Sequence, residues 1–180
     1  MQQLSWFQVE REIRVQQQVL RVHHNCRFDK DVFRANDPVM DADGDSTASR
    51  HEIAQFCQQA GNYIAQDFVV LADGLPCAVR QQSFSVNDDD SGFSSDIVAD
   101  LPDAATTGVL LLHVVDPSFL FTYPGESQTT TTSVIAEAPI KLVDDAGREL
   151  HRLDLPRSPH SVLRISPRAR PNQGAGTPKP

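Results

Sequence analysis

The 180-residue sequence is poor in the residues that mark the commonest small folds and catalytic sites. Its three cysteines form no CxxC pair, which argues against a zinc ribbon and a disulfide-dense mini-fold. No nucleophile elbow, glycine-rich phosphate loop or HExxH motif occurs, so no catalytic motif supports an enzyme. An enzyme of unrecognised class stays a rival interpretation, because scattered aspartates and histidines can converge in a folded chain.

Long apolar segments and excess positive charge are also missing. No apolar run reaches the roughly eighteen residues of a transmembrane helix, so we expect no membrane insertion by this chain. The 16 basic residues are outnumbered by 24 acidic ones, and the net charge of -8 argues against binding to nucleic acid. Residues 1–5 lack the basic start and apolar core of a signal peptide. Taken alone, they predict either a cytoplasmic protein or a chain whose natural start has been trimmed.

What the sequence does contain is an acidic stretch at 41–52, with oxygen-bearing residues at positions 1, 3, 5, 9 and 12 of twelve. This is the ligand spacing of an EF-hand calcium loop. Calcium takes about six to eight oxygen ligands, and carboxylates strengthen its binding. We predict that the ion is held by Asp41, Asp43, Asp45, the backbone carbonyl of Thr47, Ser49 directly or through water, and a bidentate Glu52.

A simpler interpretation exists for the end of this stretch. Ser49 and Glu52 also form a capping box, and an acidic turn before a capped helix needs no metal. The two interpretations are compatible. Position 6 of the loop, which is usually glycine, is Ser46, whereas the glycine is Gly44 at position 4. We expect Ser46 to adopt positive φ at a cost of about 1 kcal/mol, which lowers the affinity for calcium.

The hydrophobic periodicity predicts the fold. Alternating apolar residues at 7–15 predict a half-buried strand, followed by a bulge or second strand that runs to about Phe28, with a helix as the alternative for this segment. Apolar residues at three- and four-residue steps predict a core-facing helix over about 49–66. Pro38 predicts that any helix within 29–40 is short or missing.

The rest of the chain is rich in β-branched residues and turns. Further strands are predicted at 68–72, 77–86, 108–115, 119–122, 129–135, 140–143, 149–155 and 161–165. We expect the first two of these to pair as a hairpin, and the last to be an edge strand. The strand at 108–115 is almost wholly apolar, so we expect it at the centre of a sheet, covered on both faces, with His113 in the core.

The predicted fold class is therefore α+β: antiparallel, β-sandwich-like sheets with one long helix at about 49–66, preceded by the EF-hand-like loop. The length fits a single domain over 1–167. Residues 168–180 are rich in proline and glycine and cannot bury a core, so we expect a disordered tail or linker there.

Three other features suggest binding sites or bridges. His23, His24 and Cys26 carry ligands for nickel, cobalt or zinc, so a transition-metal chaperone or sensor is an alternative function. On a strand His24 and Cys26 would face the same way. We nevertheless favour a surface pair of histidines beside a buried cysteine.

Cys57 and Cys77 are expected to lie close enough to form a disulfide in an oxidising compartment. The acidic turn at 87–92 is expected to be a solvated loop.

The order of these parts resembles a known family. An alternating strand pair, the Asp41–Asp45 loop with Glu52, a helix, and a strand ending in the turn at Asp73 and Gly74 resemble the extracytoplasmic domains that precede the membrane part of bacterial HupE/UreJ-like and nickel/cobalt-exporter-like proteins. The similarity covers about residues 7–155. It implies a place in the periplasm or at the cell surface, a membrane-associated partner, and no catalytic residue. The sequence thus predicts a non-catalytic, calcium-binding, extracytoplasmic domain accessory to a membrane protein.

Overall fold

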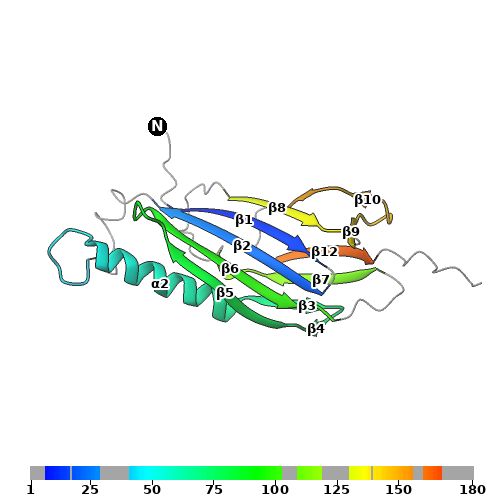
Figure 1. Ribbon diagram of the computed structural model, residues 1–180, viewed down its shortest axis with the longest axis horizontal. Helices are drawn as coiled ribbons and strands as arrows, with labels where there is room; N and C mark the ends of the chain where they lie inside the picture. The colour runs from blue at the N-terminus through cyan, green and yellow to red at the C-terminus, as the bar shows by residue number, and fades with distance from the viewer. Residues whose placement is uncertain are drawn as a thin grey trace, which may run out of the picture.

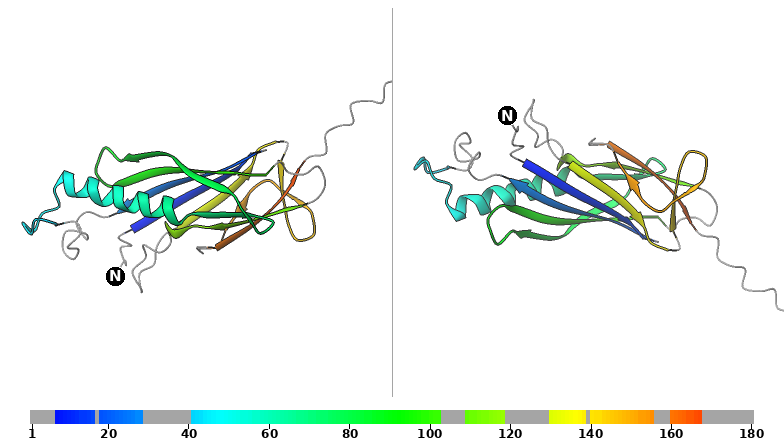
Figure 2. Two further views of the ribbon diagram at one scale, coloured as in Figure 1. Left: turned by 90° about the horizontal axis from the view of Figure 1, so that it is seen from below. Right: turned by 90° about the horizontal axis from the view of Figure 1, so that it is seen from above.

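Two six-stranded sheets face each other across an apolar core in the computed structural model, which describes residues 7–16, 18–28, 41–102, 109–118, 130–138, 140–155 and 160–167 (Figure 1). Sheet A contains, in spatial order, β11 (Leu153–Asp154), β8 (Thr130–Ala136), β1 (Phe7–Val15), β2 (Val19–Phe28), β6 (Gly92–Asp100) and β5 (Ala78–Val86). Sheet B contains β10 (Glu149–Leu150), β9 (Ile140–Val143), β12 (His160–Pro167), β7 (Leu110–Val115), β3 (Val69–Ala72) and β4 (Leu75–Pro76). Figure 2 shows the two sheets edge-on as two layers. The predicted α+β sandwich is confirmed.

The first two strands follow from the alternation of apolar and polar residues. Val9, Ile13 and Val15 of β1 are fully buried, and β2 continues the same face with Leu20 and Val22. The predicted strands are confirmed, and the helical alternative is wrong. The pairing of β1 with β8 is parallel, whereas all other strand pairings of the described residues are antiparallel.

The helix α2 (Arg50–Asp67) begins and packs as its sequence predicts. Ser49 is the N-cap and forms the complete capping box with Glu52. The apolar stripe, which includes Ile53 and Ile64, is buried against β5 and β6 of sheet A. The loop before the helix projects beyond the ends of the strands (Figure 1). No helix among the described residues combines the length and apolar character needed to cross a membrane.

Two strand pairings differ from the prediction, and the single strand predicted at 149–155 is divided into β10 in sheet B and β11 in sheet A. Residues 77–86 do not form a hairpin with β3, because the partner of β3 across the turn is the two-residue β4, which ends at Pro76. Proline lacks the N–H that a ladder needs. The Cys77 N–H still donates to the Val70 carbonyl (2.9 Å), and the chain then crosses to sheet A, where β5 pairs with β6. The last strand, β12, is not an edge strand, because it lies between β9 and β7.

The strand β7 lies inside sheet B as predicted, but the residues that the structure describes cover it on one face only. Leu112 and Val114 are buried between the sheets, whereas His113 is exposed on the outward face. The prediction that His113 is a core residue is therefore wrong.

The cysteines are free thiols. Cys57 is buried, and its thiol donates to the Gly92 carbonyl (3.8 Å); burial raises its pKa to about 12. Cys77 is half-buried, and the structure contains no bridge between these two residues. The predicted features at 29–40, 119–122 and 168–180 lie outside the described residues, and the domain boundary at 167 stays a prediction.

The close contact of β6 with β2 gives a stability test at Gly92. A Cβ there would lie 1.9 Å from the backbone carbonyl oxygen of Cys26, and φ is +156°. We expect Gly92→Ala to lower the free energy of unfolding by about 3 kcal/mol or more, because a backbone neighbour cannot move aside. The matched control is Gly147→Ala, where φ is +78° but no atom lies within 4 Å of the added carbon. It should cost only about 1 kcal/mol. If urea denaturation showed equal losses of unfolding free energy for the two variants, the close contact at Gly92 would be contradicted.

Candidate metal centre

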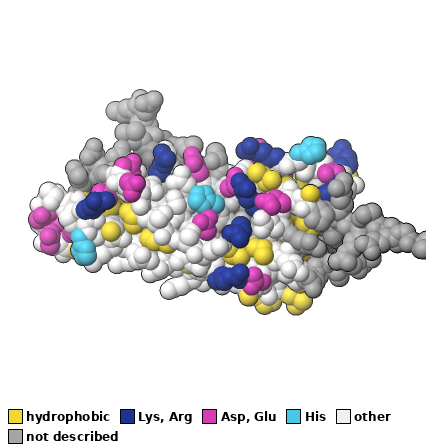
Figure 3. Space-filling view, in the orientation of Figure 1, with side chains coloured by type: hydrophobic (Ala, Val, Ile, Leu, Met, Phe, Trp, Pro, Cys, Tyr) yellow, Lys and Arg dark blue, Asp and Glu magenta, His cyan; other side chains and the backbone are white. Residues whose placement is uncertain are grey.

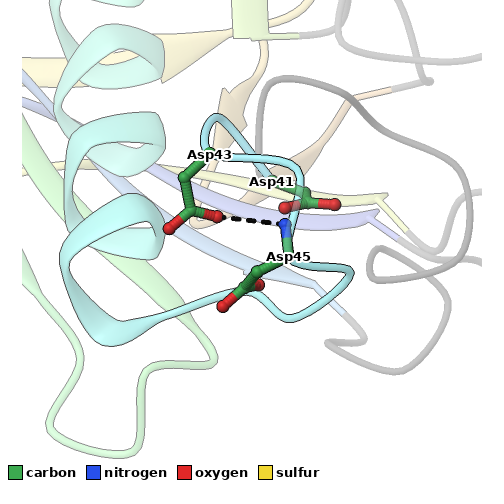
Figure 4. Close-up of side chains that lie close together, drawn as sticks. All are labelled: Asp41, Asp43 and Asp45. Atoms are coloured by element: carbon green, nitrogen blue, oxygen red, sulfur yellow. Dashed lines mark hydrogen bonds between the residues drawn. The ribbon is translucent and has the colours of Figure 1, made fainter.

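Three aspartates of the loop converge as the sequence predicts. Asp41, Asp43 and Asp45 each offer a carboxylate oxygen, and these atoms all lie within 4.8 Å of one another (Figure 4). Asp41 is half-buried, whereas Asp43 and Asp45 are exposed. A group of this kind could hold a metal ion, and its three hard oxygen donors suit calcium or magnesium better than zinc.

The loop is folded by its own aspartates. The Asp41 carboxylate accepts a hydrogen bond from the Ser46 N–H (2.9 Å), Asp43 accepts from the Asp45 N–H (3.2 Å), and Asp45 accepts from the Thr47 N–H (2.7 Å). These bonds require tight turns of the backbone. Accordingly, Ser46 has a φ of 65°, which confirms the strain predicted for a serine at position 6.

One oxygen of Asp41 distinguishes this loop from an ordinary acidic turn. Asp41 Oδ1 is buried and has no hydrogen-bond partner among the described residues. A buried carboxylate oxygen that loses water without gaining a donor destabilises the fold. A cation bound beside Asp43 and Asp45 would satisfy this oxygen, so the geometry of the three aspartates fits a metal ion.

Glu52 does not belong to this group of three, and four donors surround its carboxylate. Oε1 accepts from the N–H groups of Ala42 (2.7 Å) and Asp43 (3.4 Å). Oε2 accepts from the backbone N–H (2.8 Å) and the hydroxyl (2.7 Å) of Ser49. The Ser49 hydroxyl first, and then the backbone donors, lower the pKa of Glu52. The structure therefore places Glu52 and Ser49 in the capping role, and Thr47 beside Asp45.

The histidine and cysteine ligands of the alternative metal site do not converge. Along β2, His24 and Cys26 face the same way, as predicted, and both are fully buried in the core. His23 points the other way, to the outward face of sheet A, where its Nδ1 lies 2.8 Å from the Asp96 carboxylate. The expected surface pair of histidines is therefore wrong for His24, because strand alternation separates neighbouring residues.

His24 belongs instead to a buried polar cluster that the sequence reasoning missed. Arg11 of β1 is 2% exposed and donates to the Asp116 carboxylate (2.8 Å), which follows β7 of sheet B. Arg11 also donates to the hydroxyls of Thr132 in sheet A (3.2 Å) and Ser161 in sheet B (3.2 Å). The cluster therefore joins the two sheets across the core.

His24 and Arg11 share one oxygen of Asp116. Nε2 of His24 lies 2.8 Å from Asp116 Oδ2, and the Ser118 N–H donates to Oδ1 (2.9 Å). Burial alone would raise the pKa of Asp116, but the charges and hydrogen bonds of His24 and Arg11 outweigh it, so the pKa is lowered. The side chains of Arg11, His24 and Asp116 are 0% exposed, so this convergence of His and Asp has no contact with solvent.

A signal for this cluster exists in the sequence. Arg11 occupies the same parity as Val9 and Ile13, which is the buried face of its strand. A charged residue on an apolar face predicts a buried partner of opposite charge. That partner could not be named, because Asp116 lies 105 residues away in the sequence.

Comparison with protein-family models, with curated proteins and with solved structures finds no match to the chain.

The buried ion pair predicts a large effect of one substitution. Asp116→Asn leaves the Arg11 guanidinium without its counter-ion in the core, so we expect the free energy of unfolding to fall by about 3–5 kcal/mol. The control is Asp154→Asn, which breaks the solvated pair with Arg152, whose side chains are 64% and 73% exposed. It should change stability by less than about 1 kcal/mol. Chemical denaturation at neutral pH measures both.

The pH dependence supplies a second readout of this prediction. Because the folded-state pKa of Asp116 is lowered, its contribution is present above the unfolded-state value of about 3.9 and is lost as the pH falls below it. The difference in stability between the parent and Asp116→Asn should therefore shrink below about pH 4. A difference that stays constant down to about pH 2 would contradict an ionised Asp116.

Proposed function

We propose that this chain is a non-catalytic, calcium-binding domain, and that its ion binds in the loop at 41–52. The observation that carries the proposal is the convergence of Asp41, Asp43 and Asp45, whose oxygens lie within 4.8 Å of one another, with a buried and unpaired oxygen on Asp41. Calcium prefers such oxygen ligands and accepts irregular geometry. The Thr47 carbonyl and Ser49, directly or through water, complete the proposed set.

Glu52 is the proposed bidentate ligand, and binding would require it to move. Its Oε1 must leave the N–H groups of Ala42 and Asp43, whereas Oε2 is held by Ser49. The hydrogen bonds that are lost, together with positive φ at Ser46, oppose binding. We therefore expect a dissociation constant in the range of extracellular modules, about 0.1–1 mM.

The proposed setting is extracytoplasmic, beside a membrane protein partner. A weak calcium site suits a compartment in which calcium is abundant, and the order of strand pair, acidic loop, helix and sheet resembles that of extracytoplasmic domains attached to bacterial exporter-like membrane proteins. In this setting the ion would tie the loop to the start of α2. The loop forms one end of the molecule, where acidic side chains gather (Figure 3), and is thus placed to contact a partner.

The binding claim is tested by calorimetric titration with calcium. The parent protein should bind one ion, and Asp43→Asn should weaken binding at least about tenfold, because the site loses one of its charged ligands. The matched control is Asp88→Asn in the exposed turn between β5 and β6, which should bind calcium like the parent. Absence of binding at millimolar calcium would refute the proposal. Stoichiometric nickel or zinc binding without calcium binding would favour the chaperone alternative.

The role of Glu52 is tested by melting temperature. Calcium that binds only the folded state raises the melting temperature in proportion to the logarithm of the calcium concentration. At a hundred times the dissociation constant, the free energy of unfolding increases by about 2.7 kcal/mol. Glu52→Gln should lose most of this gain, because an amide lacks the charged bidentate contact. It should also destabilise the calcium-free protein, because the amide nitrogen of glutamine cannot accept the hydrogen bonds that one of the two carboxylate oxygens accepts. The calcium-dependent shift of each protein is therefore measured from its own calcium-free melting temperature. An equal calcium-dependent shift in both proteins would show that Glu52 acts only as a cap.

A further inference from the structure

The outward face of sheet B carries exposed valines beside charged residues, which include the ion pairs of Arg164 with Asp145 and of Lys141 with Glu149. Val69, Val109 and Val162 are 39%, 46% and 48% exposed, and all three lie at outward-facing positions of sheet B or beside it. The outward face of sheet A carries ion pairs such as Arg80 with Asp100, and Figure 3 shows basic and acidic side chains interspersed on it. Three exposed valines around β7, on a chain of net charge -8, indicate an interaction surface.

Strand register arranges this surface, here called the sheet B face, in three rows that cross β3, β7 and β12. In that order the rows are Val69, Val115 and His160; Leu71, His113 and Val162; and Asp73, Leu111 and Arg164. The buried residues Val70, Leu112 and Leu163 alternate with these positions, so the rows point away from sheet A.

The third row carries opposite charges on its two sides. Asp73 lies in the turn after β3, where its N–H donates to the Leu111 carbonyl (2.8 Å) and its carboxylate accepts from the Leu111 N–H (3.0 Å). On the other side of Leu111, the register partner is Arg164 of β12. Arg164 also pairs with Asp145, whose side chain is 90% exposed, and such a solvated pair leaves the guanidinium free to gain a second partner.

We propose that the sheet B face binds the same face of a second copy of this chain. A two-fold axis that lies in the plane of the contact and runs along β7 brings each row of one copy against the same row of the other copy, in the opposite order. This places Asp73 of each copy against Arg164 of the other, and Leu71 against Val162. The complementarity is satisfied twice, as a two-fold contact requires, and two aligned sheets pack face to face in the manner of a β-sandwich.

The middle row makes the contact sensitive to pH. His113 lies near the proposed axis and meets its counterpart, flanked by Leu71 and Val162 within its own sheet. The other titratable or charged groups on the rows are His160 and Arg164 of β12 and Asp73 beside β3. Histidine gains charge between about pH 8 and 5, so acidification adds positive charges to rows whose one acid is Asp73, beside Asp145, which pairs with Arg164. The dimer therefore weakens as the pH falls.

The test is sedimentation equilibrium of the full chain across a range of protein concentrations at about pH 8. The parent should form a dimer, and Val162→Lys should raise the dissociation constant at least about tenfold. Arg164→Glu should do the same, because it sets a carboxylate against Asp73 of the other copy. The control is Ser85→Lys at an exposed position of β5 in sheet A, which should dimerise like the parent. Melting temperatures establish that all variants are folded.

Each other outcome overturns the proposal. A parent that is monomeric at millimolar concentration would show that the sheet B face does not bind a second copy of the chain. A dimer unaffected by Val162→Lys and Arg164→Glu would use another surface. Measurement at a second pH adds a further requirement. The dissociation constant of the parent dimer should be higher at about pH 5.5 than at about pH 8, and His113→Gln should reduce that pH dependence. A dimer equally strong in the parent at both pH values would refute the two-fold contact at His113.

Discussion

The ion pair between Arg11 and Asp116 is the constraint on which the sandwich depends, because its two members belong to different sheets and have no access to water. Removing a charge from water is unfavourable, and the lost hydration free energy is offset only when the oppositely charged partner and the remaining hydrogen bonds are in place. Thr132, Ser161 and His24 supply those bonds. The sheets can therefore stack in few relative positions, whereas apolar contacts alone would tolerate sliding.

The same constraint positions the helix and the loop indirectly. Sheet A is held in place by the cluster, and α2 packs on β5 and β6 at one side of that sheet. Contact between Cys57 and the Gly92 carbonyl, and the ion pair of Arg50 with Asp90, attach the first half of the helix to the turn between these strands. The acidic loop thus extends from a rigid base, and an ion bound there acts on the N-terminal turn of α2 through Glu52.

Local patterns predicted local structure well. Val9, Ile13 and Val15 predicted a strand because side chains alternate, and Ser49 with Glu52 predicted the helix start because the capping box is contained in four residues. The meeting of three aspartates also followed from spacing alone.

By contrast, long-range partners could not be predicted. The partner of β5 depended on which sheet the chain joins after Pro76, and the partner of Arg11 lay more than a hundred residues away. Apolar residues on both faces of β7 predicted burial on both faces, although the outward face is exposed at His113.

The central claim, that loop 41–52 is a calcium site, is tested most directly by a crystal structure grown in saturating calcium. The account predicts one ion about 2.3–2.6 Å from oxygens of Asp41, Asp43 and Asp45 and from the Thr47 carbonyl. It also predicts that Glu52 has turned from the N–H groups of Ala42 and Asp43 toward the ion. A loop without an ion, in which Glu52 still accepts both of those hydrogen bonds, would contradict the account.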